Sequence, residues 1–191
     1  HARSGMIDSL ERAFAFANDF LAPEDVPFRL TAGDEFQGLI VDPKRFVDAY
    51  SVLRFTSTVP FRLGVGLGEL TTIVSDVPGA MDGPAWWQAR EAIVDAHSAT
   101  ARDAFRGFGS RSDVILDGLA AGLRATTGDW TERQRVVSLA LIAGVSNFSE
   151  AAEVLGVTRQ TIYKQSRGMK WRDTLLLRQA FHAAIEGREV R

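Results

Sequence analysis

The sequence contains no cysteine, which excludes disulfide bonds, thiol nucleophiles and thiolate metal sites. It also lacks a hydrophobic run long enough to span a bilayer, because the most apolar stretch, Val136–Val145, is too short. An excess of basic charge is missing too: 22 Lys and Arg against 24 Asp and Glu give a net charge of −2. Any affinity for nucleic acid must therefore come from a local patch. With no visible signal peptide, these features predict a soluble cytoplasmic protein.

A local patch of this kind occurs in the C-terminal third, where residues 147–170 have the pattern of a helix-turn-helix. We expect Asn147 to cap a first helix, Gly156 to form the turn, and Thr158 to cap a second helix. Small and apolar side chains such as Ile162 would face inward. The alternative is a helical hairpin within an ordinary helical core.

The second helix carries side chains that predict contacts with duplex DNA. From Arg159 to Arg172 there are five basic residues and no acidic one, which suits a phosphate backbone. A single reading helix covers only a few base pairs, so the expected DNA-binding form is a homodimer. We expect Thr158, Arg159, Gln160, Thr161, Tyr163 and Lys164 to face the groove, and Arg167 and Lys170 to face the backbone.

The whole chain alternates helical patterns with short strands, which predicts an α/β (α+β) fold. The glycine- and serine-rich loop Arg106–Ser112 is the expected boundary between an N-terminal α/β domain, residues 1–108, and an all-helical domain, residues 109–191. Helices are expected over residues 4–20, 43–53, 84–105, 113–123, 131–144 and 170–186, with a hairpin over 28–41 and a strand over 61–72.

The expected strand over residues 61–72 has glycines on one face. Gly64, Gly66 and Gly68 recur with the two-residue period of a strand, so something must approach that face closely. Two occupants satisfy this need, a tightly packed helix or a flat ligand such as a nucleotide, and the pattern does not choose between them.

Two other features are candidates for binding an anion or a metal ion. The expected hairpin has Gly33 at its turn with Asp34 and Glu35 beside it, and these carboxylates are either turn residues or metal ligands. The expected helix that begins at Pro84 carries Arg90 about two turns in, either as part of an anion site or as a solvated surface residue.

Four motifs, in this order, resemble those of the SatD family of bacterial proteins: AGDEFQGLI, RLGVGLGELTT, MDGPAWWQAREA and the helix-turn-helix. The resemblance covers most of the chain. SatD proteins usually begin with a strand that ends in Gly-Asp followed by Ser-Arg, and this sequence contains no such strand.

The segment AGDEF is also similar to the signature hairpin of GGDEF domains, with Ala32 in place of the first glycine. This resemblance implies a palm-like nucleotidyl cyclase sheet. It implies that Asp34, with Glu35 beside it, binds a metal ion such as Mg²⁺ on a nucleotide. It also implies that Gly33 allows the nucleotide to approach closely and that Arg90 binds the triphosphate. Without the Asp of the SatD opening strand, the implied metal site is incomplete.

We therefore expect a DNA-binding transcriptional regulator. Its N-terminal domain would sense a ligand, for which a nucleotide is one candidate, or provide the dimer contact. The alternative is a metal-dependent nucleotidyl transferase or cyclase that uses Asp34, with the helix-turn-helix as a targeting module. A third possibility is an interaction protein that uses neither site.

Overall fold

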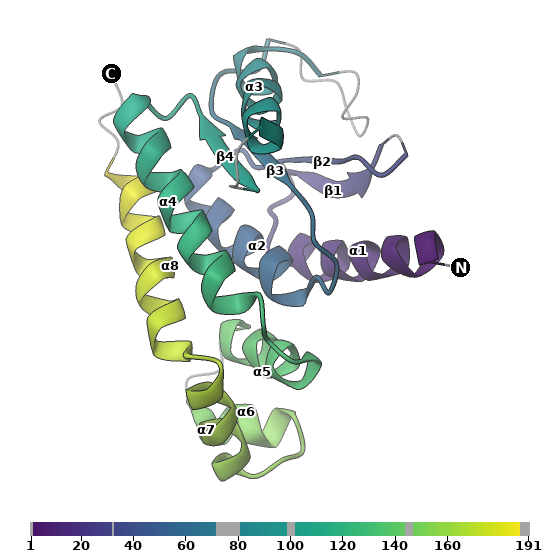
Figure 1. The fold of residues 1–191 in the computed structure, drawn as a ribbon, viewed down its shortest axis with the longest axis vertical. Helices are drawn as coiled ribbons and strands as arrows, with labels where there is room; N and C mark the ends of the chain where they lie inside the picture. Colours follow the sequence, from purple (N-terminus) through teal and green to yellow (C-terminus); the bar gives the residue numbers. More distant parts are fainter. Residues whose placement is uncertain (1, 32, 72–80, 99–101, 144–146, 188–191) are drawn as a thin grey trace.

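The structure is a computed structural model that describes residues 2–31, 33–71, 81–98, 102–143 and 147–187. Within these residues the chain forms eight helices and four strands (Figure 1). None of these helices combines the length and the apolar character needed to cross a bilayer. In chain order the elements are α1 (Ala2–Asn18), β1 (Val26–Leu30), β2 (Phe36–Leu39), α2 (Pro43–Thr56), β3 (Leu63–Gly66), α3 (Pro84–Ser98), β4 (Asp103–Arg106), α4 (Ser110–Thr127), α5 (Glu132–Ile142), α6 (Phe148–Val154), α7 (Arg159–Gly168) and α8 (Trp171–Glu186).

The four strands form two separate two-stranded sheets. β1 and β2 pair antiparallel as the expected hairpin, with Leu30 opposite Phe36. β3 and β4 pair in parallel, with Val65 opposite Phe105. The mixed α+β class is therefore confirmed, but the described strands do not form the single palm-like sheet that the GGDEF resemblance implies.

The helix expected over residues 84–105 is wrong at its C-terminal end. α3 ends at Ser98, and Asp103–Arg106 instead form β4. The backbone of β3 needs hydrogen-bond partners along this edge, and the β4 segment supplies them: Leu63 N donates to Arg102 O at 2.9 Å. Tertiary pairing therefore overrides the local helical pattern.

The main hydrophobic core joins both halves of the chain. The rings of Tyr50 on α2, Phe105 on β4 and Phe181 on α8 have centroids 5.5 to 6.2 Å apart. Arg178 on α8 also donates from Nη2 to Oδ1 of Asp48 on α2 at 2.5 Å. Residue 108, the expected domain boundary, therefore lies between segments that share one core.

The C-terminal helices divide into two groups. α4 and α8 run side by side next to α2 and β4, whereas α5, α6 and α7 form the end of the molecule farthest from the strands (Figure 1). α5 begins at the expected capping box, in which Thr131 Oγ1 accepts from Gln134 N at 3.3 Å and Gln134 Oε1 accepts from Thr131 N at 2.9 Å. This placement leaves the outer side of α7 open to solvent.

Candidate functional site

The first part of the candidate site is α6, a short helix whose start is fixed by its cap. Asn147 Oδ1 accepts hydrogen bonds from Ser149 N at 2.8 Å and Glu150 N at 3.1 Å, as its position before the helix predicts. Ala151 and Ala152 are buried, so the small side chains let α6 approach its neighbours closely. α6 packs against α5 and α7.

A tight turn connects α6 to α7. Gly156 has φ +62°, a left-handed conformation that glycine adopts without steric cost. Val157 N donates to Ala152 O at 2.9 Å and closes the turn. Thr158 then caps α7, because its Oγ1 accepts from Thr161 N at 3.2 Å. The turn and both caps agree with the sequence prediction.

The inner face of α7 fixes the orientation of the helix. Ile162 and Met169 are fully buried, and Ser166 is buried between them. Trp130, which precedes α5, donates from Nε1 to Met169 O at 3.1 Å and ties the end of α7 to the neighbouring helices. Because these contacts fix the inner face of α7, the outer face of the helix points in a defined direction.

The outer face of α7 carries the side chains that the sequence analysis assigned to DNA. Tyr163 is 52% exposed, whereas Thr161 is half-buried. The other predicted residues are all exposed, and none of them lies next to an acidic residue of the same helix, since α7 contains none. These exposed residues are Thr158, Arg159, Gln160, Lys164, Arg167 and Lys170.

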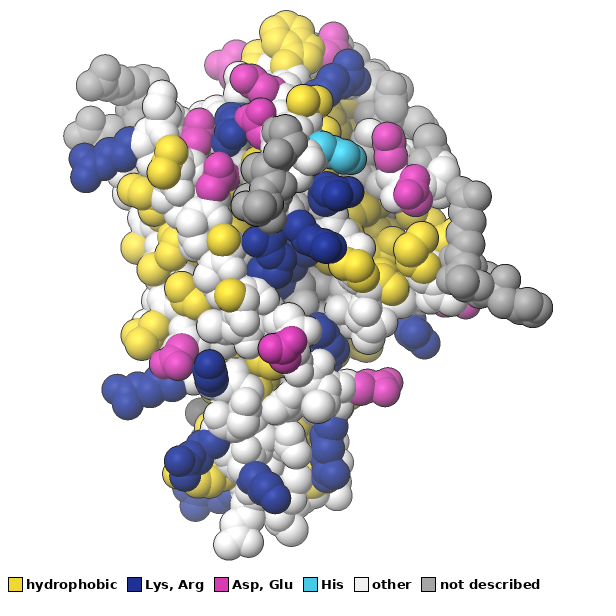
Figure 2. All heavy atoms as spheres, in the orientation of Figure 1, with side chains coloured by type: hydrophobic (Ala, Val, Ile, Leu, Met, Phe, Trp, Pro, Cys, Tyr) yellow, Lys and Arg dark blue, Asp and Glu magenta, His cyan; other side chains and the backbone are white. Residues whose placement is uncertain are grey.

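The charge of this end of the molecule is predominantly positive on the α7 side. Lys and Arg side chains stand out on the lower end of the molecule in Figure 2, where Figure 1 places α6 and α7. A surface depression lies between the starts of the two helices and is lined by Asn147, Phe148, Ser149 and Arg159. The arrangement combines helix N-termini, polar side chains and cations on one surface, the groups that contact phosphates and base edges.

The hairpin carboxylates lie elsewhere, at the tip of β1–β2. Gly33 has φ +65°, and Asp34 and Glu35 are exposed beside it. Thr31 N donates to Glu35 O at 2.9 Å, which closes the turn. Within the described part of the chain, no group of three or more His, Asp and Glu side chains is arranged to hold a metal ion. Here the carboxylates are placed as turn residues.

The glycine face of β3 is occupied by α3, the first of the two occupants that the glycine pattern allowed, and not by the nucleotide that was the other candidate. A Cβ added to Gly66 would lie 2.1 Å from Ala85 O, and one added to Gly64 would lie 2.5 Å from Ala89 O. At Gly68 the same test meets Ala85 N at 2.7 Å. The close approach that the pattern requires is therefore that of a helix backbone, which leaves no room for a nucleotide on this face.

The structure does not bring Arg90 together with the hairpin. Arg90 is exposed on α3, and α3 packs on β3 and β4, whereas Asp34 belongs to the other sheet. The tip of the hairpin projects away from α3 (Figure 1). The phosphate-and-metal arrangement that the GGDEF resemblance implies is thus divided between two parts of the molecule.

A buried polar cluster that the sequence did not reveal lies at the junction of α2 and β4. Tyr50 donates its hydroxyl to Asp103 Oδ2 at 2.7 Å, and Arg54 forms an ion pair with Asp103 Oδ1. Tyr50 and Arg54 have helical spacing, a weak signal of a shared face. The role of Asp103 was not predicted, because the sequence pattern predicted a helix at this position and not the strand β4.

Comparison with known proteins identifies one family. A family model described as the SatD family matches residues 3–166, which is most of the chain. No curated protein and no solved structure matches the chain. The family assignment from the sequence motifs is therefore confirmed.

Proposed function

This chain belongs to the SatD family, and we propose that it is a DNA-binding transcriptional regulator in which α6 and α7 act as a helix-turn-helix. The observation that carries the proposal is the two-sided character of α7. Its inner face is buried at Ile162 and Met169, while its outer face is polar, cationic and free of acidic residues. A helix held in this way presents a fixed set of donors to a DNA groove.

The outer residues divide between the two kinds of DNA contact. Arg159 and Gln160 stand at the N-terminal end of α7, the end from which a recognition helix contacts base edges. Lys164 lies one turn further on. Arg167 and Lys170, near the C-terminal end, are assigned to the phosphate backbone.

The expected form on DNA is a homodimer on a two-fold symmetric site. One reading helix covers only a few base pairs, so two copies are needed for useful specificity. The remainder of the chain would supply the dimer contact or sense a ligand. The nucleotidyl transferase alternative gains no support from the hairpin, because Asp34 lies at the turn between β1 and β2, whereas Arg90 lies on α3, which packs on the other sheet.

The test is a comparison of DNA binding by wild type and by the double variant Arg159→Ala, Lys164→Ala. Duplexes selected from a random-sequence pool by the wild-type protein would serve as the probe, and binding would be measured at several salt concentrations. We expect the double variant to bind at least about tenfold more weakly, with a salt dependence reduced by about one to two phosphate contacts.

A matched control keeps the net charge of the double variant but leaves α7 intact. Lys44 and Arg111 are exposed cations on α2 and α4, and the variant Lys44→Ala, Arg111→Ala should bind DNA nearly like wild type. Equal binding by wild type and the α7 double variant would refute the assignment of the reading helix.

A further inference from the structure

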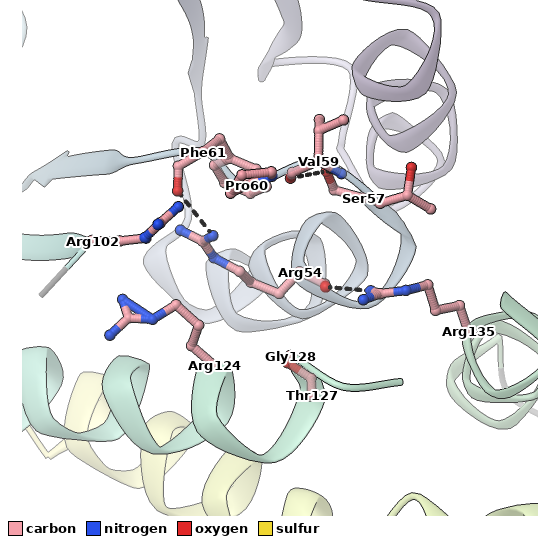
Figure 3. A pocket seen from close by; sticks show the side chains of 11 residues that line it. Arg54, Ser57, Val59, Pro60, Phe61, Arg102, Arg124, Thr127, Gly128 and Arg135 are labelled. Atoms are coloured by element: carbon pink, nitrogen blue, oxygen red, sulfur yellow. Dashed lines mark hydrogen bonds between the residues drawn. The ribbon is translucent and has the colours of Figure 1, made fainter. Parts of the chain in front are cut away.

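A pocket of about 300 Å³ lies where the C-terminal ends of α2 and α4 meet the starts of β4 and α5. Four arginines line it, Arg54, Arg102, Arg124 and Arg135, and none of its described lining residues is acidic. Figure 3 shows the guanidinium groups of Arg54, Arg102 and Arg124 facing a common space. Four cations around one small cavity attract an anion strongly.

Arg54 forms the rigid back wall of this pocket. Its side chain is only 6% exposed and is paired with Asp103 behind the pocket. Its guanidinium lies 3.8 Å from the centre of the Phe61 ring, and Nη1 donates to Phe61 O at 3.3 Å. The Nε of Arg54 is buried and has no hydrogen-bond partner among the described residues. Arg54 is therefore held in place before any ligand binds.

Arg124 and Arg102 supply the uncommitted charge. Arg124 Nη1 is buried and, within the described part of the chain, has no hydrogen-bond partner. The structure gives neither Arg102 nor Arg124 an ion pair with a described residue, and Arg102 is an exposed residue of the pocket lining. Buried donors without partners are uncommon in folded proteins because each one costs desolvation energy, and a bound acceptor removes that cost.

Arg135 completes the ring from the side of α5. Its Nη1 donates to Phe55 O at 3.0 Å and to Arg54 O at 3.3 Å, so it caps the end of α2. Burial lowers the pKa of Arg54, and the charges of Arg124 and Arg102 lower it further, although Tyr50 opposes the shift. Four lining arginines against the carboxylate of Asp103 give this region a net positive charge.

We propose that this arginine pocket binds a small ligand bearing a phosphate group, either inorganic phosphate or diphosphate or a phosphate monoester. Guanidinium groups match the geometry and charge of phosphate oxygens, and three of them converge on one space here. The volume lies at the lower end of the range for ligand pockets, roughly 300–1,000 Å³, so the ligand is small. The pocket is distinct from the hairpin and from the β3 glycines, which were the candidate nucleotide-binding residues of the sequence.

The position of the pocket also gives the ligand a route to the proposed DNA reader. Arg135 belongs to α5, and α5 packs directly against α6 and α7. A ligand that draws Arg124 and Arg135 together would alter how α5 sits against the end of α2, and with it the placement of α7. This regulatory part rests on the proposed function, whereas the binding of phosphate does not.

Isothermal titration calorimetry at constant ionic strength tests the binding. Inorganic phosphate, diphosphate and glycerol phosphate would be titrated into wild type, Arg124→Gln and Arg102→Gln, with Arg111→Gln as the control. Arg111 is exposed on the same helix as Arg124 and does not line the pocket. We expect one site per chain for at least one of these anions, about tenfold or more weaker in both pocket variants and unchanged in the control.

The relative affinities of the three anions identify the source of the phosphate. Tighter binding of glycerol phosphate than of the other two indicates a phosphate ester. Tighter binding of diphosphate than of glycerol phosphate indicates an inorganic anion. No saturable binding of any of the three, or equal affinity in wild type and Arg102→Gln, would overturn the proposal. Arg102 is exposed, so its variant decides the matter even if Arg124→Gln does not fold. Loss of DNA binding in Arg102→Gln without phosphate binding by wild type would mean that the pocket is a DNA contact instead.

DNA binding measured with and without the bound anion tests the regulatory part separately. A change in affinity for DNA that is absent in Arg102→Gln supports it. An anion that binds without changing DNA affinity overturns the regulatory part alone, and a chain that binds no DNA leaves the calorimetric result intact.

Discussion

Arg54 on α2 and Asp103 on β4 form an ion pair in the protein interior, although 49 positions separate them in the chain. Their side chains are 6% and 1% exposed. Tyr50 donates to the second carboxylate oxygen at 2.7 Å, so each oxygen of Asp103 has a partner. Removing charges from water is costly unless they are paired and hydrogen-bonded, and this cluster therefore fixes the position of β4 against α2.

We expect Asp103→Asn to lower the free energy of unfolding by about 3–5 kcal/mol, because it leaves the buried Arg54 without a counter-charge. Chemical denaturation would measure the change. Asp34→Asn is the matched control, since Asp34 is exposed at the hairpin tip, and its effect should stay within about 0.5 kcal/mol. Similar small losses in the free energy of unfolding of both variants would show that the Arg54–Asp103 pair does not stabilise the fold.

The same cluster predicts a loss of stability in alkaline solution. Burial raises the pKa of Tyr50, so the folded chain keeps the phenolic proton at a pH where the unfolded chain has released it. This contribution to stability is fully present below about pH 10 and is lost as the pH rises further. Denaturation curves recorded between about pH 8 and pH 11 should show the free energy of unfolding falling at the upper end of the range.

Tyr50→Phe should reduce the alkaline slope, because it removes the titrating group. The chain contains only one other tyrosine, Tyr163, which is 52% exposed on α7. Tyr163→Phe is therefore the control and should keep the wild-type slope. If the two variants lose the same part of the slope, Tyr50 is not its source.

Gly66→Ala tests the packing of α3 on β3. The added Cβ would lie 2.1 Å from Ala85 O and 2.2 Å from Ala89 N, so α3 must move away. We expect the free energy of unfolding to fall by about 1–3 kcal/mol. Gly118→Ala on α4 meets no atom within 4 Å and should instead raise it by about 0.5–1 kcal/mol. A free energy of unfolding unchanged by Gly66→Ala would mean that α3 does not pack closely on the glycine face of β3.

Local signals predicted the parts of the fold whose causes are local. The caps Asn147 and Thr158 each bond to backbone groups two or three residues away, and the box of Thr131 and Gln134 spans three positions. Such contacts depend on spacing alone, so the sequence contains the information needed to find them. The α6–turn–α7 unit was therefore located to within a residue or two.

The parts that escaped prediction depend on contacts between distant segments. β4 exists because β3 needs a parallel partner, and its own four residues carry no strand pattern. The glycines of β3 showed that something approaches closely, but only the structure shows that it is α3. The arginine pocket is a further case, since Arg54 and Arg135 lie 81 positions apart and share no motif.

Lys170→Gly should have opposite effects on stability and on DNA binding. Lys170 has φ +50°, a left-handed conformation that is unfavourable for a residue with a side chain, and it is the only described non-glycine residue with positive φ. Glycine adopts this conformation without steric cost, so the free energy of unfolding should rise by about 0.5–1 kcal/mol in chemical denaturation. Lys170 is also exposed next to α7, and losing its charge should weaken DNA binding and reduce the salt dependence by about one phosphate contact.

Lys164→Ala separates the two effects of Lys170→Gly. Lys164 has an ordinary helical backbone on α7, so its replacement should weaken DNA binding without the gain in stability. A Lys170→Gly variant that is less stable than wild type would show that the lysine side chain stabilises this junction more than the strained backbone costs. A variant that is more stable and binds DNA unchanged would remove Lys170 from the backbone-facing set and confine the reading surface to α7 itself.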